Sequence, residues 1–213
     1  MEKPKIKMII IINLKTYQQG RAVIKLAKKI QKVSKSIIIG AQASDIYELS
    51  KQTKLRIFAE HVDPYEPGRY TGFIIPEAVK KDGAKGTFLN HSEHKLDFSV
   101  IKKTIKRCKK IKLKTAVFAK DLREAKKIQK LRPDYLIYEP PELVAGNISV
   151  STAKPEIIEK IAKKLRMKFL VGAGIKTRED IKIAKKLGAS GIAVSSAITK
   201  AKNPEKALRE LVG

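Results

Sequence analysis

The stretch DYLIYEPPELVAG, residues 134–146, decides how the rest of the chain is interpreted. Its apolar first half is typical of a short buried strand, so Glu139 would stand where that strand ends and its loop begins. Two prolines fix φ at successive positions, while Ala145 and Gly146 are small, which favours a rigid loop with flexible ends. Glu139 is therefore a candidate catalytic carboxylate, and a solvated glutamate in an ordinary strand-to-helix connection is the alternative.

Seven further apolar or β-branched runs resemble this one, and each is followed by a stretch with helical spacing. The eight runs span residues 7–13, 36–41, 55–62, 86–90, 114–119, 134–139, 168–172 and 191–195. Eight strand-helix alternations in 213 residues predict an α/β fold of the closed (β/α)8 type, a TIM barrel, in a single domain over residues 1–213. An open, doubly wound sheet is the alternative.

Helix boundaries are marked by capping residues. Asp121 is a predicted N-cap for a helix over residues 122–131, and Thr177 for one over residues 178–187. Asn203 and Pro204 open the last predicted helix, with proline at its first position. These signals support the alternating pattern.

The formal net charge is +26 at pH 7, a positive field that attracts anions. Lysine pairs recur in nearly every predicted helix, so the charge would cover all sides of the molecule rather than one face. Aromatic residues are sparse and the sequence carries no recognised RNA- or DNA-binding motif. We therefore expect a basic exterior that binds nucleic acid only non-specifically.

Cysteine and histidine usage argues against a metal site. Cys108 is the single cysteine, and His61, His91 and His94 lack the spacing of a structural zinc site. The apolar run at residues 8–12 is too short to span a membrane and is followed by Asn13 and Lys15 rather than by a cleavage site. We expect a soluble, cytoplasmic protein without membrane attachment.

Residues at the carboxyl ends of barrel strands surround one pocket. The first six predicted strands would place an amide, a cation, an imidazole and a carboxylate there: Asn13, Lys15, His91 and Glu139. The last two strands end in small residues whose backbone N–H groups can close around a phosphate: Gly172, Gly174, Ser195 and Ser196. Singly, each has an ordinary alternative, such as a tight turn or a structural histidine. Together they predict a phosphate site beside acid-base groups.

This ordered set resembles triosephosphate isomerase, particularly its short archaeal form. The resemblance extends over residues 11–204 and rests on Asn13-Leu14-Lys15, Tyr70-Thr71-Gly72, Asn90-His91-Ser92-Glu93, Tyr138-Glu139-Pro140 and the two small-residue turns. It implies interconversion of dihydroxyacetone phosphate and D-glyceraldehyde 3-phosphate through an enediolate, in glycolysis and gluconeogenesis. It also implies that no cofactor is needed, because proton transfer next to a carbonyl requires only a base and an electrophile.

The resemblance assigns roles to the candidate residues. Glu139 would be the base, in a site from which the loop over residues 140–146 excludes water when it closes as a lid. His91 would polarise the carbonyl and shuttle protons, and Lys15 would offset the developing negative charge. Asn13 would orient the substrate and Glu93 would support the site's geometry or a proton relay. Backbone groups near Ala145, Gly146, Gly172, Gly174, Ser195 and Ser196 would hold the phosphate.

The loop over residues 62–76 would reach into a neighbouring subunit, where Thr71 would contact Asn13 and His91. The resemblance thus implies a homo-oligomer, and the short archaeal form favours a tetramer over a dimer. An ordinary long surface loop is the alternative.

Several positions depart from the usual family pattern. Phe73 and His94 stand where many members have an acidic residue and an arginine that bridge subunits. Ala145 begins an Ala-Gly-Asn segment in place of a common Gly-Thr-Gly, and Gly174 replaces a serine. We expect these changes to affect lid motion and phosphate affinity more than the reaction type.

Two other functions are compatible with parts of the pattern. Another phosphate-binding barrel enzyme, such as an aldolase or synthase, would share the last two turns but would not explain Lys15, His91 and Glu139 together. A basic, nucleic-acid-associated barrel with a vestigial site is suggested by the net charge alone.

Overall fold

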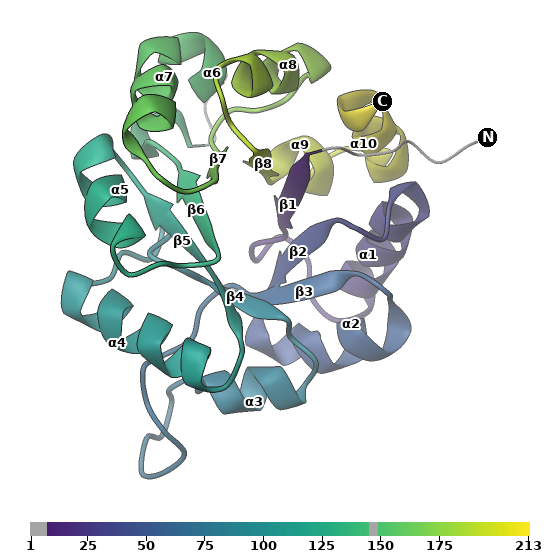
Figure 1. The fold of residues 1–213 in the computed structure, drawn as a ribbon. Coiled ribbons are helices and arrows are strands. Elements are labelled where there is room, and N and C mark those ends of the chain that lie inside the picture. Colours follow the sequence, from purple (N-terminus) through teal and green to yellow (C-terminus); the bar gives the residue numbers. More distant parts are fainter. Residues whose placement is uncertain (1–7, 145–148) are drawn as a thin grey trace.

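A computed structural model describes residues 8–144 and 149–213 of the protein. Within these ranges, eight parallel strands form a closed barrel in sequence order, and helices surround it (Figure 1). The strands are β1 (Ile9–Asn13), β2 (Ile38–Ala41), β3 (Arg56–Ala59), β4 (Gly86–Leu89), β5 (Lys114–Ala119), β6 (Tyr135–Tyr138), β7 (Phe169–Val171) and β8 (Gly191–Val194). The barrel closes because β8 pairs with β1, with Ile192 opposite Ile10. The predicted (β/α)8 fold is confirmed, and the open sheet is excluded.

Helices connect the strands. They are α1 (Arg21–Val33), α2 (Ile46–Gln52), α3 (Pro76–Lys81), α4 (Phe98–Lys110), α5 (Leu122–Gln129), α6 (Val150–Ala153), α7 (Pro155–Lys164), α8 (Arg178–Lys186), α9 (Ser196–Thr199) and α10 (Pro204–Val212), with short 3-10 turns at Ala43–Asp45 and Pro141–Leu143. The predicted caps are confirmed: the side chains of Asp121, Thr177 and Asn203 accept backbone N–H groups of α5, α8 and α10.

Alternate strand residues divide the core into two layers. Every strand sends one or two side chains into the barrel: Ile11, Ile38, Phe58, Phe88, Ala116, Phe118, Ile137, Leu170 and Ala193. Their neighbours along the strands pack outward against the helices, where Cys108 of α4 is also fully buried. The filled barrel gives a rigid support for the loops at its carboxyl edge.

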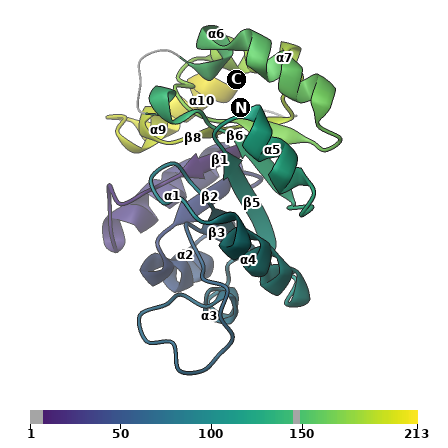
Figure 2. The same cartoon turned by 90° about the vertical axis from the view of Figure 1, so that its left-hand side faces the viewer.

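The segment between β3 and α3 extends away from the barrel as an open loop (Figures 1 and 2). Asp63 ties its base, because the Asp63 N–H donates to the Ile74 carbonyl (2.7 Å) and the Ile74 N–H donates to Asp63 Oδ2 (2.8 Å). The strand β3 ends at Ala59 and not at residue 62 as predicted, because its pairing with β2 and β4 ends at Ala59.

Aromatic rings stiffen the same loop. Tyr65 stacks on Tyr70 with ring centroids 4.3 Å apart, and Phe73 meets Tyr65 edge-on at 4.6 Å. Tyr70 and Phe73 nevertheless remain 43% and 49% exposed. The loop is thus internally packed while its outer surface is apolar.

The helices also bear on membrane attachment. Among residues 8–144 and 149–213, no helix is both long enough and apolar enough to cross a lipid bilayer.

Candidate active site

The carboxyl edge of the barrel brings the predicted acid-base residues together. Asn13 is the last residue of β1, His91 lies two residues beyond β4, and Glu139 directly follows β6. His91 and Glu139 are only 7% and 8% exposed. One cavity is bordered by most of the predicted set, namely Asn13, Lys15, His91, Glu139, Gly174, Ser195 and Ser196.

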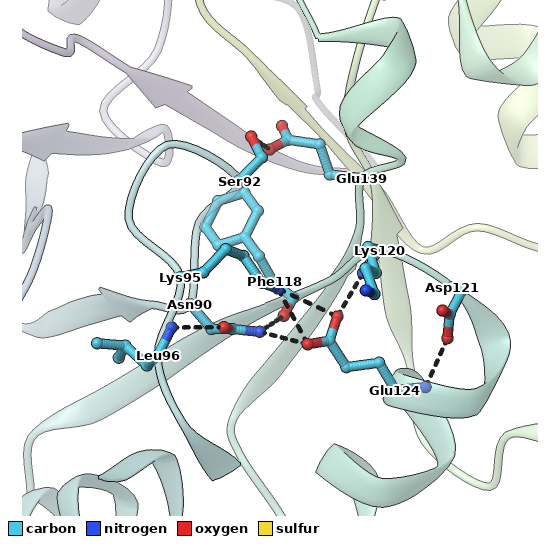
Figure 3. A network of polar contacts seen from close by, with 9 residues as sticks. All are labelled: Asn90, Ser92, Lys95, Leu96, Phe118, Lys120, Asp121, Glu124 and Glu139. Carbon is cyan, nitrogen blue, oxygen red and sulfur yellow. Dashed lines mark hydrogen bonds and ion pairs between the residues drawn. The ribbon is translucent and has the colours of Figure 1, made fainter.

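His91 and Glu139 are in direct contact. His91 Nε2 lies 3.1 Å from Glu139 Oε2, and the Ser92 hydroxyl donates to the same oxygen at 3.3 Å. Figure 3 shows Ser92 and Glu139 facing each other above the barrel. The ring of Phe118 meets the imidazole edge-on at 4.7 Å between centroids, so an apolar surface supports the histidine from below.

The second imidazole nitrogen is fixed by the backbone. The Glu93 N–H donates to His91 Nδ1 at 3.1 Å. A nitrogen that accepts this bond carries no proton, so the ring proton lies on Nε2 and points at Glu139. His91 therefore presents a neutral N–H donor to the cavity.

Lys15 is held in an unusual backbone conformation. Its φ is +50°, and its N–H donates to Asn13 Oδ1 at 3.1 Å. Its ammonium group pairs with Glu93 Oε1 at 2.5 Å. The Glu93 side chain is mostly exposed while Lys15 is not, so the pair anchors a largely buried cation at the edge of the cavity.

A buried amide organises the loop that carries His91. The Asn90 Nδ2 group donates to the Phe118 carbonyl (2.8 Å) and to Glu124 Oε1 (3.0 Å), and the Leu96 N–H donates to Asn90 Oδ1 (3.1 Å) (Figure 3). Asn90 has a φ of +62°, which asparagine tolerates better than most residues. The network therefore fastens the loop after β4 to β5 and α5.

Glu124 completes this network. Burial raises the pKa of its carboxyl, but hydrogen bonds from the Lys120 N–H, the Asn90 amide and Lys95 outweigh burial and lower the pKa below its usual value. Glu124 thus remains ionised as an acceptor beneath the site.

The opposite wall of the cavity is small and polar. Ala173 and Gly174 have φ values of +73° and +68° and turn the chain sharply after β7. The Ser195 hydroxyl oxygen is buried and has no hydrogen-bond partner within the described part of the chain. An unpaired buried hydroxyl beside a cavity is suited to a polar ligand group.

Gly172 has a different position from the other predicted phosphate residues. A Cβ placed on Gly172 would lie 2.8 Å from Glu139 Oε1. The glycine therefore leaves room for the carboxylate of Glu139 in its observed position.

The loop after β6 begins as predicted and then leaves the described residues. Its first part is the 3-10 turn Pro141–Leu143, after which Val144 borders the cavity. A hydrogen bond from Lys154 lowers the pKa of Glu142. The predicted contacts of Ala145 and Gly146 lie outside the residues that the structure describes.

Of the two predicted supporting residues, Glu93 lies at the cavity and Thr71 lies away from it. Glu93 contacts both Lys15 and His91, whereas Thr71 is exposed in the projecting loop and is not brought to this chain's own cavity. Sequence reasoning missed the contacts of Ser92 and Phe118. Phe118 could have been found as the penultimate residue of a predicted strand, where an inward side chain forms the pocket floor.

Comparisons with known proteins agree with this geometry. The family model described as "Triosephosphate isomerase" matches residues 8–211. Triosephosphate isomerase of Saccharolobus solfataricus is 44% identical, with 96% of this chain and 94% of that protein covered. That of Methanocaldococcus jannaschii is 38% identical, with coverages of 96% and 99%, and that of Sulfolobus acidocaldarius is 39% identical, with 96% and 93%. The chain therefore belongs to the triosephosphate isomerase family.

Proposed function

We propose that this protein interconverts dihydroxyacetone phosphate and D-glyceraldehyde 3-phosphate, as a glycolytic and gluconeogenic isomerase of the short archaeal type. The contact between His91 Nε2 and Glu139 Oε2 carries the proposal, because it joins an N–H donor and a carboxylate at the floor of one cavity. Isomerisation of a triose phosphate needs this pair, because one group must remove a carbon-bound proton and the other must donate a hydrogen bond to the neighbouring oxygen.

Glu139 removes the proton next to the substrate carbonyl. The substrate first has to replace the 3.1 Å contact between Glu139 and His91, since no carbon atom fits between groups at that distance. Glu139 then returns the proton to the adjacent carbon, which completes the isomerisation. The Ser92 hydroxyl is a positioning group for the carboxylate.

His91 donates its Nε2 proton towards the substrate oxygen. Its Nδ1 atom remains bound to the Glu93 N–H, so the ring can take part without changing its orientation. Lys15 offsets the negative charge of the enediolate, and Asn13, bound to the Lys15 backbone, orients the substrate. The reaction uses no metal or organic cofactor.

The phosphate group binds at the opposite wall. The buried Ser195 hydroxyl donates to a phosphate oxygen, and backbone groups of Ser196 and Gly174 contribute beside it. Ala145 and Gly146 complete this enclosure when the loop after β6 closes as a lid. The net charge of +26 raises the encounter rate with the phosphate dianion.

The protein assembles as a homo-oligomer through the projecting loop. A second cavity beside the site is bordered by Asn13, Lys15, Ile74, His91 and His94, and the neighbouring subunit's loop enters it with Thr71 at its tip. The apolar outer surface of the loop supports docking. This apolar contact would take the place of the ion pair between an acidic residue and an arginine that is common between subunits in the family. Phe73→Ala is expected to reduce assembly in sedimentation velocity, and unchanged assembly would remove the docking role of Phe73.

The assembly is a tetramer rather than a dimer. Phe98, at the start of α4, is 43% exposed and lies outside the projecting loop, so it offers a second apolar contact. In sedimentation velocity, Phe98→Ala should convert tetramers to dimers. If the mass of the assembly is unchanged, Phe98 has no role in assembly.

The protein works in the cytoplasm, as expected for an enzyme of triose phosphate metabolism. Its charge gives it only non-specific affinity for nucleic acid, and retention on a nucleic-acid column should fall steeply as salt rises. Retention that does not change with salt would exclude binding driven by phosphate groups.

The deciding experiment is a coupled assay of glyceraldehyde 3-phosphate isomerisation with wild type, Glu139→Gln and Glu156→Gln. Glu156 is an exposed carboxylate of α7 and serves as a matched control. We expect activity in the wild type and control and its loss in Glu139→Gln. A folded, assembled wild type without activity at several salt concentrations and temperatures would reject the proposed function.

A further inference from the structure

Glu60 is a partly buried acid that the proposed reaction does not use. It directly follows β3, and its backbone N–H donates to the Ala41 carbonyl at the end of β2 (3.0 Å). Its side chain therefore lies at the same carboxyl edge of the barrel as Asn13 and His91.

The surroundings of Glu60 belong to the site. It borders the second cavity together with Asn13, Lys15, His91 and Glu93. Its Oε1 atom is buried and has no hydrogen-bond partner among the described residues. A carboxylate with an unpaired buried oxygen is disfavoured relative to the neutral acid.

The charges around Glu60 come from several segments. Lys15 lies in the loop after β1, and His91, Glu93 and His94 lie in the loop after β4, while His61 is its neighbour in the chain. Burial is the main influence and raises the pKa of Glu60 to about 7. The Lys15 N–H and the charge of Lys15 oppose this rise, as would His91 if it were protonated, and Glu93 adds to it. Both protonation states of Glu60 are therefore populated near neutral pH.

We propose that Glu60 is a positioning residue for the isomerase reaction. Its side chain sets the net charge around Lys15, and the enzyme is more active when Glu60 is neutral. This inference rests on the proposed function. When Glu60 is neutral, the ammonium group of Lys15 is paired with the single carboxylate of Glu93 among the described residues. When Glu60 is ionised, a second carboxylate borders the cavity that Lys15 lines.

The second carboxylate acts against the reaction. It repels a dianionic substrate and the enediolate, both of which Lys15 attracts. One additional charge at the edge of the site lowers kcat/KM by about tenfold. The effect develops as pH rises through neutrality.

The test compares kcat/KM of wild type and Glu60→Gln from pH 5.5 to 9, in steps, with Glu48→Gln as an exposed carboxylate control on α2. Glutamine keeps the size of the side chain and removes its ionisation. Titration of the substrate phosphate affects all three proteins equally, so the ratio of Glu60→Gln to wild type isolates Glu60. Sedimentation of each protein at both ends of the range records assembly.

We expect this ratio to be near one at the acidic end and to rise about tenfold above neutrality, while the control ratio stays flat. A flat ratio for Glu60→Gln in active protein would overturn the inference and leave the proposed function intact. Loss of wild-type activity that follows dissociation at high pH would also overturn it, because the effect would then belong to assembly. An inactive wild type at every pH would instead reject the proposed function.

Discussion

Nε2 of His91 lies 3.1 Å from Oε2 of Glu139, although the two residues follow different strands, β4 and β6. The proposed donor and the proposed base are thus hydrogen-bonded to each other. This contact keeps two buried polar groups satisfied and holds both at the edge of one cavity, where the proposed substrate would bind. The positions of both side chains should therefore be sensitive to small changes.

Shortening the base tests this sensitivity. Glu139→Asp retracts the carboxylate by one methylene, which is expected to lower kcat by about 100-fold because the reacting atoms are misplaced. The melting temperature should change little, since no apolar contact is lost. Activity by coupled assay and unfolding by calorimetry check both parts, and unchanged kcat would contradict the role of Glu139.

Adding a side chain at Gly172 is expected to displace the Glu139 carboxylate. The new methyl group of Gly172→Ala would lie 2.8 Å from Glu139 Oε1, and the flexible end of the glutamate would move away. We expect kcat to fall by about tenfold or more with little loss of stability. A fully active Gly172→Ala enzyme would show that the site tolerates a shifted base.

Removing the Ser92 hydroxyl tests its hold on Glu139. Ser92→Ala deletes one donor to the carboxylate, and we expect kcat to fall by about three- to tenfold because the bond is long at 3.3 Å. KM should remain near the wild-type value. Ser36→Ala, an exposed serine outside the site, is the matched control.

The Asn90 network is expected to contribute to stability. Asn90→Gly keeps the left-handed backbone but leaves the Phe118 carbonyl and the Leu96 N–H without their partner, at a cost of about 2 kcal/mol. Asn90→Ala adds about 1 kcal/mol because alanine is strained at positive φ. Urea unfolding of both variants separates the two effects; equal stability of all three proteins would show that the network is not needed.

Stability should depend on pH through Glu60. The pKa of Glu60 in the fold is about 7, above its ordinary value of 4.5, so the folded protein binds the proton more tightly than the unfolded chain. This contribution is complete below pH 4.5, declines as pH rises to 7 and is then absent. Relative to wild type, Glu60→Gln should therefore gain about 3 kcal/mol between pH 4.5 and pH 8. Urea unfolding across this range checks the direction, and a constant difference would contradict it.

The sequence by itself determined the order of the elements and the chemistry at their ends. Short apolar or β-branched runs and capping residues such as Asp121 and Thr177 act within a few residues, so they predict strands and helices without knowledge of distant contacts. Because all parallel strands of a barrel end at one edge, residues such as Asn13, His91 and Glu139 could be assigned to one pocket from their positions alone.

The tertiary structure decided which groups touch. Barrel closure and strand register set Phe118 under His91 and Gly172 behind Glu139, and these distances depend on pairings between strands far apart in the chain. The partial burial of Glu60 has the same origin, since Glu60 borders a cavity together with residues of the loops after β1 and β4. Desolvation is a property of the assembled surroundings rather than of the residue, so a glutamate after a predicted strand gives no local sign of an altered pKa.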